Sequence, residues 1–472
     1  KGSVTIGANK TLKKSESPYV ITTPNLSISS GVTVDVEAGT VIKFSGANSL
    51  TISGMLKTHG TAAEPVVFTS INDDSYGGDM NGDGTTTPAA AGDWNAIQPT
   101  ASGSVFDHAI IRYGGKIDPF YGLVQAQLQA SNVAITITNS ISEFSGTGGF
   151  WFSGASGEVS SSTIQDNSTG SKGMHVSAGT LTVKNNTFQR NGVGLFVGGS
   201  SSGSNIVTVS NNTFTNNTGN PVEYYGGKVS FSGNQASGNP VNGIVVRGAL
   251  LNGGTFGPDL PYIMDNDAHK SVASGTSLAV SAGTNFKFKS AVAMYIDGTL
   301  TAQGTSALPI IFTSIHDDDC SISGGCGDTN VATTSPQAGD WGGVIFRASG
   351  TATSTLDRVI VRYGGNKNVN IGDLGAVAVQ SGTSTVVINN STIEKSFFAG
   401  IAAIGSGTAS TTISDSIIRD NLISFGSSTA GYGVWTRLSA NPTIFNTHFS
   451  NNGTHIATSS ATWTDGGGNV FE

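Results

Sequence analysis

Residues 65–74 read PVVFTSINDD, and residues 309–318 read PIIFTSIHDD. The same offset relates VTVDVEAGTVIKF at 32–44 to TSLAVSAGTNFKF at 276–288. Both blocks are rich in Val, Ile, Phe and Thr, the residues that suit a pleated and half-buried strand. Their return in the same order indicates that one group of strands is built twice.

Two further blocks extend the duplication. AGDW at 91–94 recurs at 338–341, and DHAIIRYGG at 107–115 recurs as DRVIVRYGG at 357–365. The offsets differ slightly between blocks, so the length changes fall in loops, which tolerate them. We predict two homologous units, residues 1–248 and residues 249–472.

A shorter repeat follows the duplicated blocks in each unit. In the first unit Ile164, Phe188 and Phe214 return about every 25 residues, each beside Thr and Asn. The second unit contains similar segments at a similar spacing: Ser391-Thr392-Ile393, Ser416-Ile417-Ile418 and Thr447-His448-Phe449. One period suits a coil of short strands, and coils must stack to bury their apolar faces. A β-propeller is the alternative, but its blades repeat at roughly 40–50 residues. We predict an all-β parallel β-helix with little or no helix.

Composition narrows the class of protein. Charged residues make up 11% of the chain, Gly numbers 65, and the net charge is −8 with 23 Lys and Arg. Nucleic-acid binding proteins carry basic patches, so we expect no nucleic-acid partner. No apolar run approaches the ~20 residues that span a bilayer, so we expect no membrane span. We expect a secreted, extracellular protein of the cell surface.

The blocks GTVIKF (39–44), PVVFTS (65–70) and RYGG (112–115) carry a resemblance to known proteins. The chain resembles right-handed parallel β-helix proteins of the pectate-lyase-like superfamily. More narrowly, it resembles large secreted prokaryotic surface proteins with such blocks. The resemblance spans most of the chain and implies the fold and secretion, whereas the activities of that superfamily are mixed.

An acidic loop at 72–94 interrupts the first unit. Its Asp79-x-Asn81-x-Asp83-Gly84 pattern places oxygen ligands at alternate positions, as calcium loops do. An EF-hand would need Glu at the twelfth position, which is Ala90 here. We predict a Ca²⁺ site that draws on Asp73, Asp74, Asp79, Asn81, Asp83 and Asp93. A solvated loop, in which Asp and Asn only form turns, is the alternative.

The corresponding loop of the second unit, 316–341, departs from this pattern. Its remaining candidate ligands are Asp317, Asp318, Asp328, Asn330 and Asp340. Cys326 stands in the place of Asp79, and Cys320 lies close by, so we predict a local disulfide in an oxidising compartment. The disulfide would partly replace calcium in restraining the loop. Two free thiols are the alternative.

The cluster Phe150, Trp151 and Phe152 occurs only in the first unit. Exposed aromatic rings offer flat apolar surfaces on which sugars stack, so we predict these residues as glycan contacts. Filling of the core is the alternative.

Catalysis has weaker support. A hydrolase needs two carboxylates roughly 5–10 Å apart, but the paired acids of this chain fall in the predicted metal loops. Arg112 and Arg362 are candidate lyase bases, yet their recurrence in both units indicates a structural role. We predict no catalytic residues and no enzyme activity, with a polysaccharide lyase as the alternative.

The predicted function is therefore structural. We expect an extracellular structural or adhesive surface protein with calcium-stabilised loops, a subunit of a cell-surface filament or lattice. Its partners would be further copies, docked head to tail, or cell-surface glycans. A carbohydrate-binding or polysaccharide-degrading β-helix protein is the alternative function.

Overall fold

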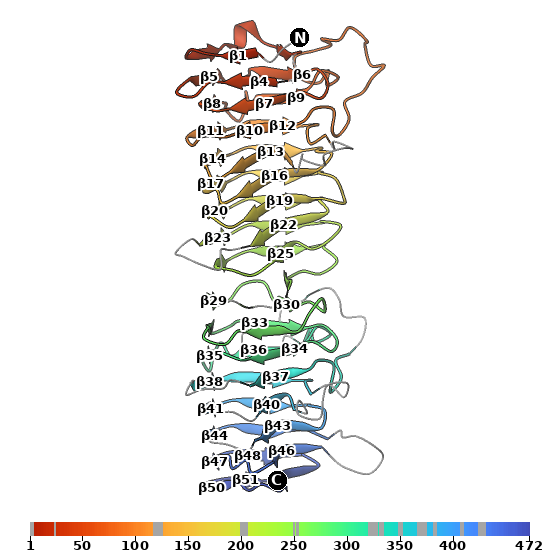
Figure 1. Cartoon of the computed structure of the whole chain (residues 1–472). Coiled ribbons are helices and arrows are strands. Elements are labelled where there is room, and N and C mark those ends of the chain that lie inside the picture. Colours follow the sequence, from red (N-terminus) through yellow and green to blue (C-terminus); the bar gives the residue numbers. More distant parts are fainter. Residues whose placement is uncertain are drawn as a thin grey trace. The chain divides into compact units, whose positions relative to one another are not determined.

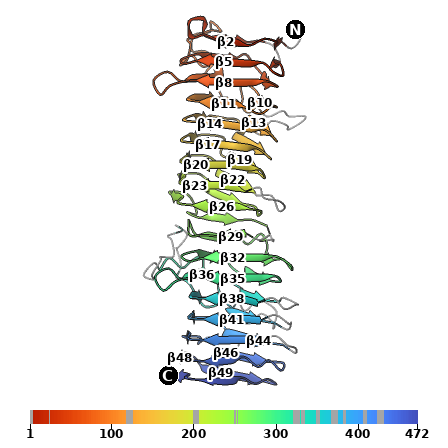
Figure 2. The same cartoon turned by 90° about the vertical axis from the view of Figure 1, so that its left-hand side faces the viewer.

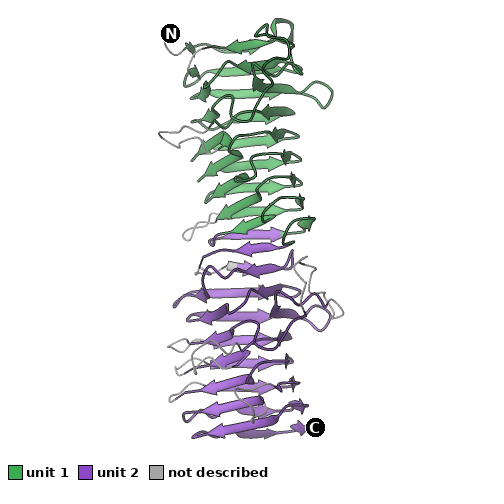
Figure 3. Cartoon of the chain, turned by 90° about the vertical axis from the view of Figure 1, so that its right-hand side faces the viewer, with its two compact units in different colours: residues 1–224, 232–242 green, residues 225–231, 243–472 purple. Residues whose placement is uncertain are grey.

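The structure is a computed structural model that divides into two compact units. It describes residues 4–22, 25–116, 126–198, 206–248, 251, 254–319, 329, 335–347, 353–365, 375–380, 385–405, 410–422 and 431–472. Unit 1 comprises residues 1–224 and 232–242, and unit 2 comprises residues 225–231 and 243–472 (Figure 3). The predicted boundary after residue 248 lies shortly after Asn242, the last residue of unit 1.

Unit 1 contains three parallel sheets, which we name 1A, 1B and 1C. Sheet 1A consists of β1 (Val4–Ile6), β4 (Asn25–Ile28), β7 (Ser49–Ile52), β10 (Ile97–Pro99), β13 (Ala126–Ser131), β16 (Gly148–Ser153), β19 (Lys172–Ser177), β22 (Val193–Gly198) and β25 (Val222–Tyr224). Sheet 1B consists of β2 (Lys10–Leu12), β5 (Thr33–Glu37), β8 (Met55–His59), β11 (Ser104–Asp107), β14 (Ala134–Thr138), β17 (Ser156–Ser160), β20 (Thr180–Lys184) and β23 (Val207–Ser210). Sheet 1C consists of β3 (Tyr19–Ile21), β6 (Val41–Phe44), β9 (Val66–Ser70), β12 (Ala109–Arg112), β15 (Ile141–Glu143), β18 (Thr163–Gln165), β21 (Thr187–Gln189), β24 (Thr213–Thr215) and β27 (Gln235–Ser237). The strand β26 (Val229–Ser232) spans the sequence boundary between the units.

Unit 2 repeats this arrangement in sheets 2A, 2B and 2C. Sheet 2A consists of β31 (Lys270–Val272), β34 (Ala293–Ile296), β37 (Gly343–Phe346), β40 (Val377–Val379), β43 (Ala399–Ile404), β46 (Tyr432–Arg437) and β49 (Thr454–Ser459). Sheet 2B consists of β29 (Gly254–Phe256), β32 (Ser277–Ser281), β35 (Thr299–Gln303), β38 (Thr353–Asp357), β41 (Thr385–Asn389), β44 (Ser410–Ser414), β47 (Thr443–Phe445) and β50 (Thr464–Gly467). Sheet 2C consists of β28 (Ile244–Val246), β30 (Tyr262–Met264), β33 (Asn285–Phe288), β36 (Ile310–Ser314), β39 (Val359–Arg362), β42 (Thr392–Glu394), β45 (Ile417–Arg419), β48 (His448–Ser450) and β51 (Val470–Phe471).

Within each unit, successive coils stack so that every third strand returns to the same sheet. In unit 1, β13, β16, β19 and β22 lie one above the next in chain order (Figure 1), as do β14, β17 and β20 (Figure 2). The predicted ladder of Ile164, Phe188 and Phe214 is paired residue to residue across sheet 1C. All three side chains are buried, and the two Phe rings stack at 4.9 Å. The periodic apolar residues therefore form the core.

The duplicated AGDW block fixes one coil to its neighbour. The buried Trp94 ring stacks on Phe44 with centroids 4.1 Å apart, and its indole N–H donates to the Arg112 carbonyl at 2.9 Å. Trp341 repeats both contacts in unit 2. Gly92 has φ +85°, a left-handed conformation that favours glycine at this turn. These contacts explain why the AGDW sequence is the same in both units.

Buried asparagines form ladders at the turns of unit 1. The amide of Asn167 donates to Asn191 at 2.9 Å, that of Asn191 to Asn217 at 3.2 Å, and that of Asn217 to Asn239 at 3.0 Å. Each side chain also accepts the backbone N–H of the preceding ladder member. The ladders satisfy buried polar groups that the turn would otherwise leave unpaired.

The predicted all-β chain of parallel strands is confirmed. In the described ranges the one helical segment is a 3₁₀ turn, Lys14–Glu16. No helix in the described chain has the length and hydropathy needed to cross a bilayer.

We predict that Asn191→Ala lowers the free energy of unfolding by about 1–3 kcal/mol, because it leaves buried donors of Asn167 without an acceptor. Equilibrium denaturation measures the change. Thr180→Ala, at an exposed position, is the control and should shift stability by less than about 0.5 kcal/mol. Equal stability of the two variants would contradict a structural role for the ladder.

Candidate functional site

The centres of β16, β19 and β22 carry aromatic side chains that point away from the core of unit 1. Trp151, His175 and Phe196 are paired in register, and each is partly exposed. Ring centroids lie 6.1 Å apart for Trp151 and His175, and 4.4 Å apart for His175 and Phe196. The strand neighbours on either side are buried, because successive side chains alternate between the faces of a sheet. We call these three residues the aromatic row.

Amide side chains extend the aromatic row on the neighbouring strands. Gln129 is paired in register with Trp151, and Gln98 lies on β10, the next strand of the sheet. A hollow of about 310 Å³ beside Trp151 is lined by Gln98, Pro99, Thr100, Gln129 and Ser131. A flat ring, amides and an open hollow therefore meet at one place.

A second row runs parallel to the aromatic row, two residues further along each strand. Ser131, Ser153 and Ser177 are paired in register, and we call them the serine row. No hydrogen bond to their hydroxyls, or from the indole N–H of Trp151, forms within the described part of the chain. These donors and acceptors face the surface and are available to a ligand.

Charge is sparse on this face. Of the described outward side chains on the strands of sheet 1A from β13 to β25, Lys172 and Glu223 are the charged ones. The Lys172 ammonium lies 5.0 Å from the Phe196 ring centroid, and Glu223 accepts the Asn220 amide at 2.7 Å. Burial, with a smaller effect from the Lys172 charge, lowers the pKa of His175 to about 4. The imidazole is therefore a neutral aromatic ring near neutral pH.

Of the three predicted glycan contacts, Trp151 alone lies on the outer face. Phe150 and Phe152 are 1% and 0% exposed and pack in the core, because they alternate with Trp151 along β16. Sequence reasoning missed His175 and Phe196. Aligning GGFWFS at 148–153 with KGMHVS at 172–177 and VGLFVG at 193–198 would have found both.

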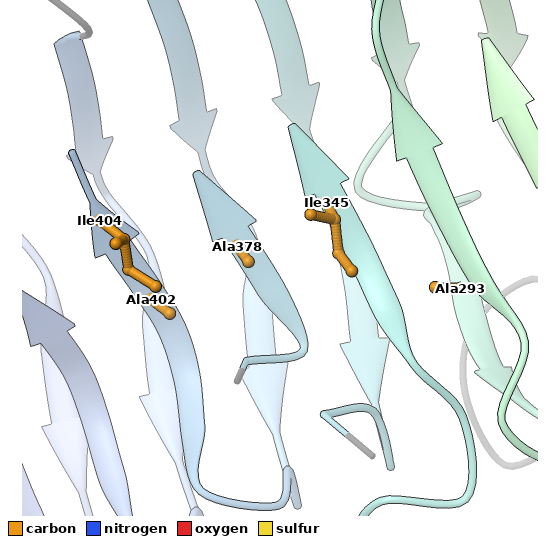
Figure 4. Close-up of a cluster of buried hydrophobic side chains, with 5 residues drawn as sticks. All are labelled: Ala293, Ile345, Ala378, Ala402 and Ile404. Atoms are coloured by element: carbon orange, nitrogen blue, oxygen red, sulfur yellow. The ribbon is translucent and has the colours of Figure 1, made fainter. Parts of the chain in front are cut away.

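The equivalent outer row of unit 2 is apolar. It comprises Tyr295, Ile345, Ala378, Ala402 and Trp435, paired in register across sheet 2A. Ile345, Ala378 and Ala402 are fully buried and belong to one cluster with Ala293 and Ile404 (Figure 4). The outer row of sheet 2A therefore lacks the amides of sheet 1A, and its two rings, Tyr295 and Trp435, are partly exposed like Trp151 but are separated by three buried aliphatic residues.

The acidic loop of unit 1 brings three of its predicted ligands together. Carboxylate oxygens of Asp74, Asp79 and Asp83 lie within 4.8 Å of one another. One buried oxygen of Asp74 and one of Asp83 accept no hydrogen bond from the described residues. Hydrogen bonds from the backbone of Gly84 and Gly82 lower the pKa of Asp79, which favours its charged form. Hard oxygen ligands with unused lone pairs suit a Ca²⁺ ion.

The other predicted ligands of this loop have partners of their own. Asp73 accepts the Thr69 hydroxyl at 2.5 Å, and Asp93 accepts the Ser70 hydroxyl at 2.6 Å. Asn81 is exposed and donates its amide within the loop. Asp73 and Asp93 thus anchor the loop to the end of β9.

In the second loop the described acids are paired with cations or hydroxyls. Asp317 contacts Arg362 at 2.6 Å, Asp318 contacts Lys287 at 2.5 Å, and Asp340 accepts the Ser314 hydroxyl at 2.6 Å. The predicted ligands Asp328 and Asn330 and the predicted disulfide partners Cys320 and Cys326 lie outside the described residues.

A buried lysine contacts each loop, and the two lysines differ in the groups that they contact. Lys43 and Lys287 occupy the same register position, opposite Thr69 and Thr313. Lys43 donates to the carbonyl oxygens of Asp73 and Gly78, and burial lowers its pKa although nearby carboxylates oppose the shift. Lys287 instead contacts the Asp318 carboxylate directly. An internal cation is therefore already paired with the acid in unit 2 that corresponds to Asp74.

The two candidate lyase bases lie in ion-pair networks. Arg112 contacts Glu143 at 3.3 Å and Asp73 at 3.6 Å, and its side chain is 12% exposed. Arg362 repeats the arrangement with Asp317 and Glu394 and is 4% exposed. A base must reach the proton it abstracts. Both arginines instead tie the loop of one coil to the strand of the next.

Comparison with family models gives one match. The model described as a right handed beta helix region matches residues 120–252 and 343–471, together more than half of the chain. The predicted right-handed parallel β-helix is thereby confirmed. The search of curated proteins gives no match.

Several solved structures are similar to the chain. One is the catalytic unit of a thermostable GH87 alpha-1,3-glucanase from Streptomyces thermodiastaticus, at 13% identity, covering 93% of this chain and 63% of that chain with a TM-score of 0.30. The catalytic domain of a GH87 alpha-1,3-glucanase in complex with tetrasaccharides follows at 12% identity, 95% and 65% coverage and a TM-score of 0.23. A mutant tailspike protein of E. coli bacteriophage HK620 in complex with pentasaccharide matches at 11% identity, 98% and 72% coverage and a TM-score of 0.29. The chain spans less than two thirds of the length of the glucanase domains. At such values the likeness shows the fold alone.

These comparisons contradict two predictions. The solved structures are glucanase catalytic domains and sugar-bound tailspikes, with which the predictions of a structural or adhesive surface protein and of no enzyme activity do not agree, and neither prediction is kept. Trp151, His175 and Phe196 lie far apart in the sequence and meet only through the pairing of strands from successive coils. Head-to-tail self-association stays an untested prediction.

We predict that Arg362→Ala lowers the free energy of unfolding by about 3–5 kcal/mol, because it leaves the buried carboxylate of Asp317 without its cation, while Glu394 keeps its ion pair with Arg419. Chemical denaturation measures the loss. Arg190→Ala removes a surface pair with Asp166 and should cost at most about 1 kcal/mol. A stable Arg362 variant would show that the arginine is not structural.

Proposed function

Because the chain belongs to the right-handed β-helix family, we propose that it is a carbohydrate-active protein that binds an oligosaccharide on the outer face of sheet 1A. The observation that carries the proposal is the aromatic row, three partly exposed rings in register on adjacent strands. Aromatic faces provide flat apolar contact, and the polar groups beside them fix orientation, as binding sites for small molecules require.

The polar groups around the row are those that a sugar needs. Gln98 and Gln129 carry amides that can both donate to and accept from hydroxyl groups. The hollow beside Trp151 leaves room for a sugar ring next to the indole face. Glycan-bound relatives of similar fold agree with this class of ligand. Secretion fits a polysaccharide ligand and stays part of the proposal.

Turnover of the bound sugar is part of the test. Most glycoside hydrolases use two carboxylates roughly 5–10 Å apart. On the described face of sheet 1A the row offers one carboxylate, Glu223, at its β25 end. Release of reducing ends should therefore be measured in parallel with binding, and Glu223→Gln identifies whether this carboxylate contributes.

We predict that Trp151→Ala weakens oligosaccharide binding at least about tenfold, because a central aromatic anchor commonly contributes 2 kcal/mol or more. Trp435→Ala, the matched change on sheet 2A, should leave affinity unchanged. Isothermal titration with a panel of soluble oligosaccharides gives both values, with folding checked by thermal melting. Equal losses in the two variants would refute the assignment to sheet 1A.

We further propose that Ca²⁺ is held by Asp74, Asp79 and Asp83 in the loop of unit 1. The support is the close approach of the three carboxylates and the unused buried oxygens of Asp74 and Asp83. The ion would add positive charge to that of Lys43, whose ammonium donates to carbonyl oxygens and not to these carboxylates, and it would restrain a long loop. For the described part of the loop in unit 2 we propose no ion, because Lys287 already neutralises Asp318.

We predict that each chain binds one Ca²⁺ and that the ion raises the melting temperature. At a free concentration about 100 times Kd the stabilisation is about 2.7 kcal/mol. Asp74→Asn should abolish the effect, whereas Asp318→Asn should not. Calorimetric titration that finds two ions, or melting that is insensitive to calcium, would contradict the proposal.

A further inference from the structure

Two parallel rows on sheet 1A together determine what shape of ligand the face can hold. The aromatic row crosses β16, β19 and β22, and the serine row crosses β13, β16 and β19. Adjacent strands lie about 4.8 Å apart, and residues two apart in a strand lie about 7 Å apart. The face therefore repeats a stacking surface and a hydroxyl edge along the direction in which coils stack.

This repeat matches an extended chain of sugar rings better than a single sugar. The rungs on β13, β16 and β19 each offer one side chain beneath a ring and one hydroxyl at its edge, whereas the rung on β22 offers Phe196 with Gly198 at its edge. The rung spacing is comparable to the length of one sugar unit. Gln129 continues the aromatic row by one rung, with Gln98 on the strand beyond. Four or more adjacent rungs are thus equipped to contact a ligand.

The charges on the face determine the chemical class of that chain. Lys172 and Glu223 carry opposite charges, and the remaining outward polar and aromatic groups on the described strands of sheet 1A from β13 to β22 are amides, hydroxyls and rings. A polyuronate needs a cation near each carboxylate, usually an arginine that binds it through two hydrogen bonds. Two arginines, Arg112 and Arg362, recur at the same position in both units, but each already forms ion pairs with acidic residues of its own unit.

Resting on the proposed function, we infer that the face of sheet 1A takes an uncharged glycan, extended along the stacking direction over at least four rungs. The aromatic row forms the floor of the site and the serine row its hydrogen-bonding edge. Affinity then grows with the number of sugar units until the rungs are filled, and it does not depend on salt.

The test is isothermal titration of the full chain with three probes: neutral gluco-oligosaccharides of several linkages, as tetrasaccharides and as disaccharides, and tetragalacturonate. We expect at least one neutral tetrasaccharide to bind about tenfold or more tightly than the disaccharide of the same linkage. Tetragalacturonate should bind at least about tenfold more weakly. Changing the salt concentration from about 50 to about 500 mM should leave the neutral affinity unchanged, because no charge pair forms.

Two different failures are distinguishable. If no probe binds, the proposed function fails together with the inference. If a probe binds in a Trp151-dependent way but the disaccharide equals the tetrasaccharide, or tetragalacturonate binds as tightly with a steep salt dependence, the inference alone is overturned. Ser153→Ala combined with Ser177→Ala adds a second check, since the pair should weaken tetrasaccharide binding severalfold while the melting temperature is retained.

Discussion

Everything in this structure depends on the in-register pairing of each strand with its equivalent in the next coil. Backbone N–H and C=O groups of one coil find partners in the next, and side chains at one position form a column through the unit. Inside, the columns are apolar stacks such as Phe188 on Phe214. At the turns they are asparagine ladders, and outside they are rows that face solvent. Each column therefore contributes to stability as a unit, and the proposed glycan site is itself one such column.

The duplication shows which columns serve the architecture. Both units keep the buried Trp on its stacked Phe, the arginine between two acids, and a buried lysine beneath the loop. The outer row of the first sheet differs, with Gln129 and Trp151 in unit 1 where unit 2 has Ala378 and Ala402. The lysines also differ in their partner, a carbonyl in one loop and a carboxylate in the other. The proposed glycan site therefore lies on unit 1, where these columns differ from those of unit 2.

The fold could be predicted from the sequence because block repeats and apolar periodicity report on local spacing alone. Ile164, Phe188 and Phe214 needed only their period to be placed in one stack. The site needed more, since His175 and Phe196 become neighbours of Trp151 only when the segments 148–153, 172–177 and 193–198 are aligned across coils of unequal length. The loop acids were limited in another way. Spacing alone could not separate Asp74, with an unused oxygen, from Asp73, which accepts the Thr69 hydroxyl.

The most direct measurement of the central claim is a crystal structure of the chain grown with a neutral oligosaccharide. A glycan on the face of sheet 1A should lie over Trp151, His175 and Phe196, with its hydroxyls against the serine row and its long axis across the strands. Sheet 2A should carry none. A sugar bound elsewhere, or one that runs parallel to the strands and contacts a single rung, would contradict the account.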